Sequence, residues 1–179
     1  MKKVVIISSS LRKESNSEIL AKAFEKGAVT AGNQVEMLCL RDLDIQFCKG
    51  CLACQKLGHC AIPDGASAVM ERIRTADVLV FASPVYYYSI CGQLKTFLDR
   101  MNPIYAVGHQ FEKVYLLSAA ADTEEEAVEG SQKDIQGWVD CFEGVVLAGT
   151  IFAGGVSEAG SVKAMSQKVQ EAYDAGYQV

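Results

Sequence analysis

Apolar runs and amphipathic stretches alternate regularly along the chain. Short apolar runs rich in β-branched residues are typical of strands buried on both faces of a sheet, and they occur at residues 4–8, 35–40, 78–82, 114–119 and 145–152. Apolar residues at helical spacing predict helices over residues 17–31, 68–76, 93–101, 123–142 and 162–173. Five strands that alternate with five helices predict a doubly wound α/β fold around a parallel sheet.

The length and composition fit one globular domain. The chain has 179 residues without an internal repeat or a low-complexity linker, so we expect a single domain over residues 1–179. A net charge of −5 argues against a nucleic-acid partner. No apolar run approaches the ~18 residues of a membrane span, and the run after Lys3 is too short for a signal peptide. We therefore expect a cytoplasmic protein with no membrane partner.

A polar loop follows the first predicted strand. Residues 8–17 carry five hydroxyls, one amide and one guanidinium, and a predicted helix begins where they end. Free N–H groups and the helix dipole favour an anion at such a position, and hydroxyls can donate to phosphate oxygens. The alternative is an ordinary serine-rich turn in which Ser15, Asn16 or Ser17 caps the helix. The loop has neither the G-x-G-x-x-G nor the Walker A pattern, which favours a mononucleotide.

A second candidate loop, residues 83–95, follows the third predicted strand. In a doubly wound sheet, ligands bind outside the carboxyl ends of the strands where the strand order reverses, so this loop is expected to meet the first. Pro84 stiffens it, and Tyr86, Tyr87 and Tyr88 offer flat faces with polar tips. A planar isoalloxazine ring needs such contacts. The alternative is that these tyrosines pack in the core or at a subunit interface.

Together the two loops closely resemble the NADPH-dependent FMN reductase family of flavodoxin-like proteins. The matching residues after the first strand are Ile7, Ser10, Arg12, Ser15, Asn16 and Ser17. Those after the third strand are Ser83, Pro84, Val85, Tyr86, Gly92, Gln93, Leu94, Lys95, Phe97, Asp99 and Arg100. The likeness continues through residues 149–156. It implies a flavodoxin-like, three-layer fold with a five-stranded parallel sheet in the order 2-1-3-4-5.

Two residues of the first loop depart from the family pattern. Ser9 stands where the family has glycine, and Leu11 stands where it has proline. A glycine can adopt backbone conformations that other residues avoid. We therefore expect the Cβ of Ser9 to crowd the phosphate or to strain the turn, with more effect on cofactor affinity than on the fold.

The resemblance also implies a cofactor and an activity. It assigns the FMN phosphate to Ser10, Arg12, Ser15, Asn16 and Ser17, and the ring to Pro84, Val85, Tyr86, Tyr87 and Tyr88, with residues 119–122 on the far side. The expected activity is that of an NAD(P)H-dependent, FMN-containing oxidoreductase. NAD(P)H delivers a hydride to flavin N5, a small-molecule or protein acceptor then takes the electrons, and no protein residue serves as the acid or base. The resemblance further implies a homodimer.

Four of the seven cysteines cluster in the connection over residues 41–66. Cys48, Cys51, Cys54 and Cys60 have the spacing C-x2-C-x2-C-x5-C, which suits a [4Fe–4S] cluster. The spacing also resembles that of iron–sulfur flavoproteins, and this resemblance implies that all four are ligands if a cluster is bound. A zinc site and free or redox-active thiols are the alternatives. With a cluster, the alternative function is an electron carrier between protein partners.

Overall fold

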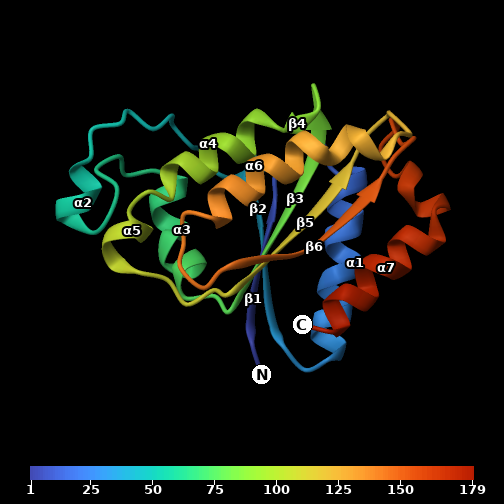
Figure 1. Cartoon of the computed structure of the whole chain (residues 1–179), viewed down its shortest axis with the longest axis horizontal. Coiled ribbons are helices and arrows are strands. Elements are labelled where there is room, and N and C mark those ends of the chain that lie inside the picture. The colour runs from blue at the N-terminus through green and yellow to red at the C-terminus, as the bar shows by residue number, and fades with distance from the viewer.

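The computed structural model describes all of residues 1–179 and shows an α/β fold around one central sheet (Figure 1). The parallel strands are β1 (Lys3–Ser8), β2 (Gln34–Cys39), β3 (Val78–Tyr86), β5 (Lys113–Ala119) and β6 (Val146–Ala153), in the order β2-β1-β3-β5-β6. A two-residue strand, β4 (Ser89–Ile90), pairs antiparallel with the end of β3. Because β4 lies outside the parallel series, the observed order is the predicted 2-1-3-4-5 arrangement.

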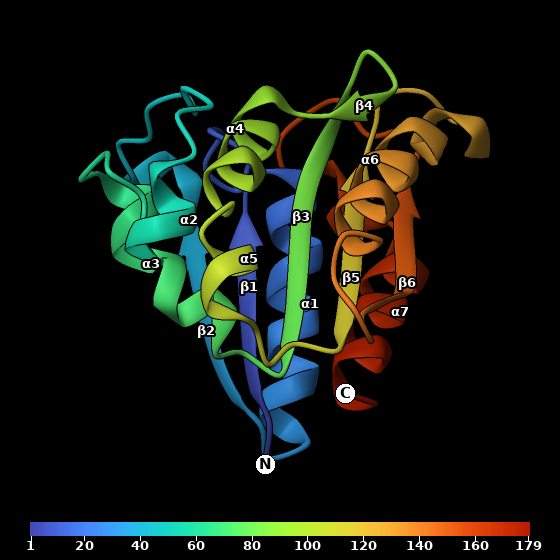
Figure 2. The same ribbon diagram turned by 60° about the vertical axis from the view of Figure 1, so that its left-hand side comes forward.

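Helices cover both faces of the sheet (Figure 2). One face carries α1 (Asn16–Thr30) and α7 (Ser166–Tyr177), and the other carries α3 (Gly65–Arg74), α4 (Gly92–Arg100) and α6 (Glu129–Val139). Two short helices, α2 (Ala53–Leu57) and α5 (Ile104–Val107), lie in the connections. Three short 3-10 helices are η1 (Leu40–Asp42), η2 (Glu125–Val128) and η3 (Ser161–Ala164). None of the helices combines the length and apolar character that crossing a membrane requires.

The core consists of two apolar clusters, one on each face of the sheet. Successive residues of β1 alternate between them: Val5 and Ile7 belong to one cluster, and Val4 and Ile6 belong to the other. This alternation explains why a central parallel strand is continuously apolar. On the face of α1 and α7, the helix backbones approach closely, since a Cβ on Gly27 would lie 2.0 Å from the carbonyl oxygen of Tyr173.

The structure corrects several predicted boundaries. β3 does not end at residue 82 but continues through Pro84 to Tyr86 and turns into β4. The helix expected over residues 123–142 begins as η2 and becomes α6 at Glu129, and the helix expected from residue 162 becomes α7 at Ser166. The helices α2 and α5 were not predicted, because four or five residues are too few to show helical periodicity.

Candidate functional site

A pocket of about 320 Å³ opens at the carboxyl ends of the strands, where the loops after β1, β3, β5 and β6 meet. It is lined by Ser10, Arg12, Ser15, Asn16, Ser17, Pro84, Val85, Tyr86, Ala119, Ala120, Ala121, Val156 and Ser157. Eight of the ten residues predicted to contact a cofactor therefore lie around one pocket. A larger groove of about 620 Å³ runs between β6 and α7. It lies away from these loops, so we place the candidate site in the smaller pocket.

One end of the pocket is built to receive an anion. Ser15 caps α1: its hydroxyl accepts the N–H of Glu18 at 3.2 Å, and its carbonyl accepts the N–H of Ile19 at 3.0 Å. The N–H groups of Asn16 and Ser17 have no acceptor within the protein. These N–H groups lie at the positive end of a fifteen-residue helix. Ser15 is thus both a helix cap and a residue of the candidate anion site.

Arg12 extends this end of the pocket toward the loop after β6. Its backbone N–H donates to the Ser10 hydroxyl at 3.3 Å, and its Nη1 donates to the Ser157 carbonyl at 2.9 Å. A guanidinium has five N–H donors, so most of the donors of Arg12 are free for a phosphate. Ser157 and its neighbour Val156 were not among the predicted site residues. Their position directly after a strand end was the sequence signal that could have identified them.

The side chain of Asn16 holds the protein together at this point. Its Nδ2 donates to the carbonyls of Val156 at 3.3 Å and Glu158 at 2.9 Å, and its Oδ1 accepts the N–H of Val162 at 3.1 Å. The amide therefore fastens the loop between β6 and α7 to the start of α1. The backbone N–H is the group of Asn16 that is left for a cofactor.

The expectation that Ser9 strains the turn or crowds a phosphate is wrong. Ser9 is completely buried, and its backbone is not among the non-glycine residues with positive φ. Its hydroxyl donates to the Ala82 carbonyl at 2.8 Å and accepts the Cys91 thiol at 3.1 Å. The side chain points into the protein, where it links the end of β1 to Ala82 in the middle of β3 and to Cys91 at the start of α4.

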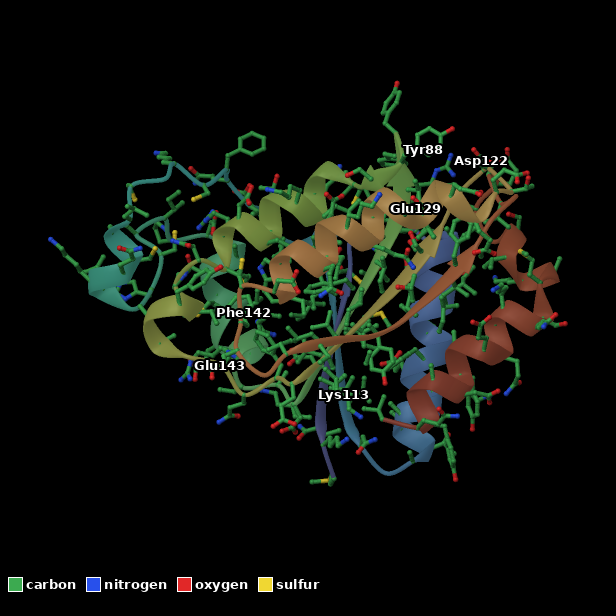
Figure 3. All side chains as sticks on the ribbon, in the orientation of Figure 1. Tyr88, Lys113, Asp122, Glu129, Phe142 and Glu143 are labelled. Atoms are coloured by element: carbon green, nitrogen blue, oxygen red, sulfur yellow. The ribbon has the colours of Figure 1, made fainter.

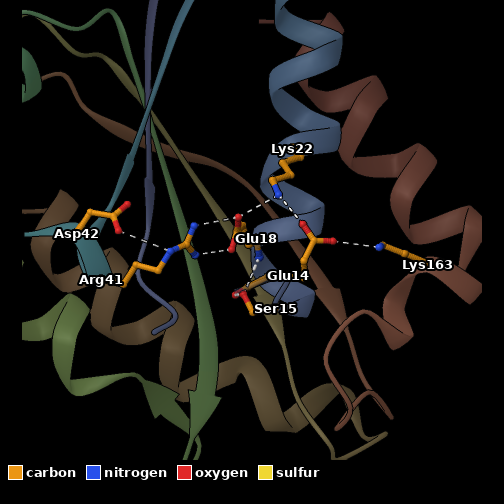
Figure 4. A network of polar contacts seen from close by, with 8 residues as sticks. Glu14, Ser15, Glu18, Lys22, Arg41, Asp42 and Lys163 are labelled. Atoms are coloured by element: carbon orange, nitrogen blue, oxygen red, sulfur yellow. Dashed lines mark hydrogen bonds and ion pairs between the residues drawn. The ribbon is translucent and has the colours of Figure 1, made fainter. Parts of the chain in front are cut away.

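Ion pairs surround the anion end of the pocket (Figure 4). Glu18 pairs with Arg41 at 2.6 Å and with Lys22 at 3.0 Å. Glu14 bridges Lys22 at 3.0 Å and Lys163 at 3.1 Å. Burial by itself raises the pKa of Glu18, but the hydrogen bonds from Arg41 and Lys22 outweigh it and leave that pKa below its ordinary value. Both carboxylates are thus ionised and balanced by cations, which limits their repulsion of a bound anion.

The other end of the pocket is a slot between the end of β3 and the residues where β5 ends. Pro84, Val85 and Tyr86 lie on one side, and residues 119–121 lie on the other. The side chains of these residues are apolar or aromatic, which suits the faces of a planar ring. Asp122, the last of the residues 119–122 expected on the far side of the ring, does not line the slot. It accepts a hydrogen bond from the Tyr88 hydroxyl at 3.3 Å (Figure 3).

Tyr87 and Tyr88 form the turn between β3 and β4 and do not line the pocket. Both adopt left-handed backbone conformations, with φ values of 51° and 61°, which are costly for bulky residues. The turn is held against α6, because Ser89 Oγ donates to Asp134 at 2.5 Å and a Cβ on Gly130 would lie 1.8 Å from the Tyr88 carbonyl oxygen. Tyr87 is fully exposed. The structure does not bring these two side chains to the predicted position beside the ring.

A second pocket brings the cysteine motif together. Cys48, Cys51, Cys54 and Cys60 all line a small cavity of about 30 Å³ next to the end of α4. Figure 1 shows this segment, which contains α2, at one end of the molecule. No three cysteine, histidine or acidic side chains converge as ligands of a single metal ion. Four thiols that line one cavity are the ligand type of both an iron–sulfur cluster and a tetrahedral zinc site.

The parallel sheet and its strand order define a flavodoxin-like fold, and the candidate pocket lies at the carboxyl ends of its strands. The chain belongs to the NADPH-dependent FMN reductase family, whose sequence model matches residues 2–159. Members of this family are FMN-dependent oxidoreductases that take electrons from NADPH.

Named relatives share sequence with this chain, and a solved structure shares its fold. The chain is 32% identical to an iron–sulfur flavoprotein of Methanocaldococcus jannaschii, over 57% of this chain and 53% of the relative. It is 27% identical to one of Archaeoglobus fulgidus, over 99% and 83%. The alignment with the first therefore spans about half of that relative's length. The fold is similar to an FMN-dependent NADH-azoreductase of Bacillus anthracis in complex with FMN, with a TM-score of 0.73, 16% identity and 99% coverage of both chains.

Proposed function

We propose that this protein binds FMN in the pocket of about 320 Å³ and uses it to pass electrons from NAD(P)H to an acceptor. The observation that carries the proposal is the joining of an anion end and a planar slot in one pocket at the switch point of the sheet. Bound FMN supplies hydride acceptance from NAD(P)H and release of electrons to an acceptor. The acceptor is a small molecule or a protein.

The residues of the pocket divide the binding of FMN between them. The hydroxyls of Ser10 and Ser17, the guanidinium of Arg12 and the free N–H groups at the start of α1 suit the phosphate. Pro84 and Tyr86 suit one face of the ring. The pocket lining contains no histidine, cysteine, lysine or carboxylate. The proposed role of the protein groups is therefore to bind and orient the cofactor.

A comparison of FMN with riboflavin tests the anion end. The apoprotein is expected to bind FMN more tightly than riboflavin, and Arg12→Ala is expected to weaken FMN binding by about 10- to 100-fold, since a charged hydrogen bond contributes about 1.5–3 kcal/mol. Riboflavin binding is expected to be unchanged. Lys13→Ala removes a neighbouring charge that does not line the pocket, so it is the matched control. Equal affinities for FMN and riboflavin in titration calorimetry would contradict the proposed site.

Anaerobic reduction tests the activity. NADH or NADPH added to the FMN-loaded protein is expected to bleach the flavin absorbance, and an acceptor is expected to restore it. Steady-state rates are expected to follow a ping-pong pattern. If neither nucleotide bleaches the bound flavin, the protein is not an NAD(P)H oxidoreductase, even if it binds FMN.

A second function is favoured by the cysteine pocket. Four thiols line one cavity, and relatives of this chain are named iron–sulfur flavoproteins. In this function Cys48, Cys51, Cys54 and Cys60 hold a [4Fe–4S] cluster, which supplies one-electron transfer, and the protein carries electrons between protein partners. Iron and acid-labile sulfide, measured after anaerobic purification, are expected at about four of each per chain. Cys54→Ser should lower both values, whereas Cys141→Ser, outside the pocket, should not; values near zero in the unmodified protein reject the cluster.

We also propose that the protein is a homodimer. Large apolar side chains are exposed near the candidate site, among them Leu11, Phe47 and Tyr87, and such surface is typical of a subunit interface. Together with the family resemblance, this supports a homodimer. Sedimentation equilibrium that gives the mass of a single chain at micromolar concentration would contradict the dimer.

A further inference from the structure

Two side chains from the end of α4 donate hydrogen bonds to thiols of the cysteine pocket. Asn102 Nδ2 donates to Cys54 Sγ at 3.1 Å, and Arg100 Nη2 donates to Cys60 Sγ at 3.3 Å. Arg100 is the last residue of α4, and Asn102 follows two residues later. Both donors therefore come from outside the segment that carries the cysteines. Their backbone is positioned by α4, which packs in the core through Leu94, Phe97 and Leu98.

Cys48 and Cys51, the two exposed cysteines of the pocket, accept no hydrogen bond from a side chain. The N–H of Gly50 lies 3.5 Å from Cys48 Sγ, and Cys51 Sγ accepts no hydrogen bond from the protein. Cys48 and Cys51 are exposed, whereas Cys54 is buried and Cys60 is half-buried. The side-chain donors are thus concentrated on the inner pair of thiols.

The charged side chain of Arg100 is buried, which costs free energy unless it has partners. Its side chain is completely buried and pairs with Asp64, with Nη1 at 2.5 Å and Nη2 at 2.9 Å from the carboxylate oxygens. It also donates to the carbonyls of Gln46 and Ile62. These bonds tie together both ends of the segment that contains the cysteines. A buried charge without such partners costs several kcal/mol, so the arrangement favours one conformation of this segment.

One donor of Arg100 has no partner. Its Nε is buried and makes no hydrogen bond within the protein. A buried donor without an acceptor costs about 1–3 kcal/mol. The hydrogen bond from Arg100 to the cysteine pocket is made by Nη2 and not by this atom.

We propose that Arg100 and Asn102 are positioning residues for an iron–sulfur cluster, and that their N–H···S bonds to Cys60 and Cys54 raise its reduction potential. The inference rests on the second function proposed above. Reduction adds one electron, and the added negative charge is shared by the cluster and its thiolate ligands. Donors aimed at those sulfurs therefore stabilise the reduced form more than the oxidised form.

The first experiment uses Asn102→Ala, with Asn33→Ala as the matched control. Both asparagines are half-buried and donate one hydrogen bond, to a thiol in one case and to the Val179 carbonyl in the other. The midpoint potential is measured by an EPR-monitored titration of the anaerobically reconstituted protein. Asn102→Ala is expected to shift it to more negative values, whereas Asn33→Ala leaves it unchanged. A tenfold weaker preference for the reduced form corresponds to about 59 mV in a one-electron couple.

The second experiment uses Arg100→Lys, which retains the positive charge opposite Asp64 but has fewer donors. It is expected to fold, as judged by its FMN content, and to show a more negative potential and less iron per chain than the unmodified protein. Unchanged potentials at full iron content in both Asn102→Ala and Arg100→Lys overturn the inference alone. An unmodified protein that takes up no iron overturns the cluster and the inference together, while leaving FMN-dependent oxidation of NAD(P)H intact.

Discussion

Glu18 offers the sharpest test of how the anion end of the cofactor pocket is held. Its side chain is only 4% exposed, and its carboxylate accepts two hydrogen bonds from Arg41, which is 18% exposed. Lys22 is half-exposed, so its pair with Glu18 contributes little after solvent screening. Glu18→Gln preserves the shape and one neutral acceptor but removes the charge that Arg41 faces.

We expect Glu18→Gln to lower the free energy of unfolding by about 2 kcal/mol at neutral pH, because a hydrogen bond with a charged partner contributes about 1.5–3 kcal/mol. For a domain of this size, such a change lowers the melting temperature by roughly 4–8 °C. Glu25→Gln is the matched control: Glu25 lies on the same helix, and it makes no ion pair. Its unfolding free energy is expected to match that of the unmodified protein.

The sign of the pH dependence follows from the lowered pKa of Glu18. A carboxylate with a lower pKa in the folded state stabilises the protein fully above the unfolded value, near 4.3 for glutamate. That contribution is lost as the pH falls through the folded pKa. In urea unfolding of the apoprotein, the difference between Glu18→Gln and the unmodified protein should therefore shrink as the pH falls from neutral to below the unfolded pKa, near 4.3. A difference that stays constant over this range, or is absent at neutral pH, refutes the reasoning.

Three further substitutions test other parts of the structure by chemical unfolding. Ser9→Gly is expected to lower the unfolding free energy by about 1–2 kcal/mol, because a buried hydrogen bond is lost; an increase would mean that the turn was strained by Ser9 after all. Tyr87→Asn is expected to raise it by about 0.5–1 kcal/mol, since asparagine tolerates the left-handed conformation better than tyrosine; a loss of stability would show that the exposed ring is needed in the free protein. Arg100→Met is expected to cost about 3–5 kcal/mol, because the buried Asp64 carboxylate loses its cation; an unchanged unfolding free energy contradicts this account.

The strands and the arrangement of the sheet could be predicted because their sequence signal is local. Each central strand is buried on both faces, so its run of apolar, β-branched residues is visible without knowledge of its neighbours. The same holds for the loop after β1, where Ser10, Arg12 and Ser15 follow a strand and precede a helix. The order of the strands then brings these residues next to the end of β3, where Pro84 lies.

The remaining features depend on contacts between distant residues. The turn at Tyr87 and Tyr88 lacks the glycine or asparagine that marks such turns, and it is held by Asp134 on α6, more than forty residues away. The side chain of Asn16 bonds to Val162, 146 residues further along the chain. Its sequence position suggested a phosphate ligand, and only the folded structure shows that its amide is already engaged.

The helix α4 gives the two candidate sites a common support. It starts beside the cofactor loop, where the N–H of Cys91 bonds to Ser83 Oγ, and it ends at Arg100 in the cysteine pocket, about 14 Å further on. Its apolar face is anchored by Phe97, which is completely buried. A defect in either loop should therefore impair one site alone. A defect at Phe97 should instead disturb both loops at once, and in the proposed electron carrier it would therefore release flavin and iron together.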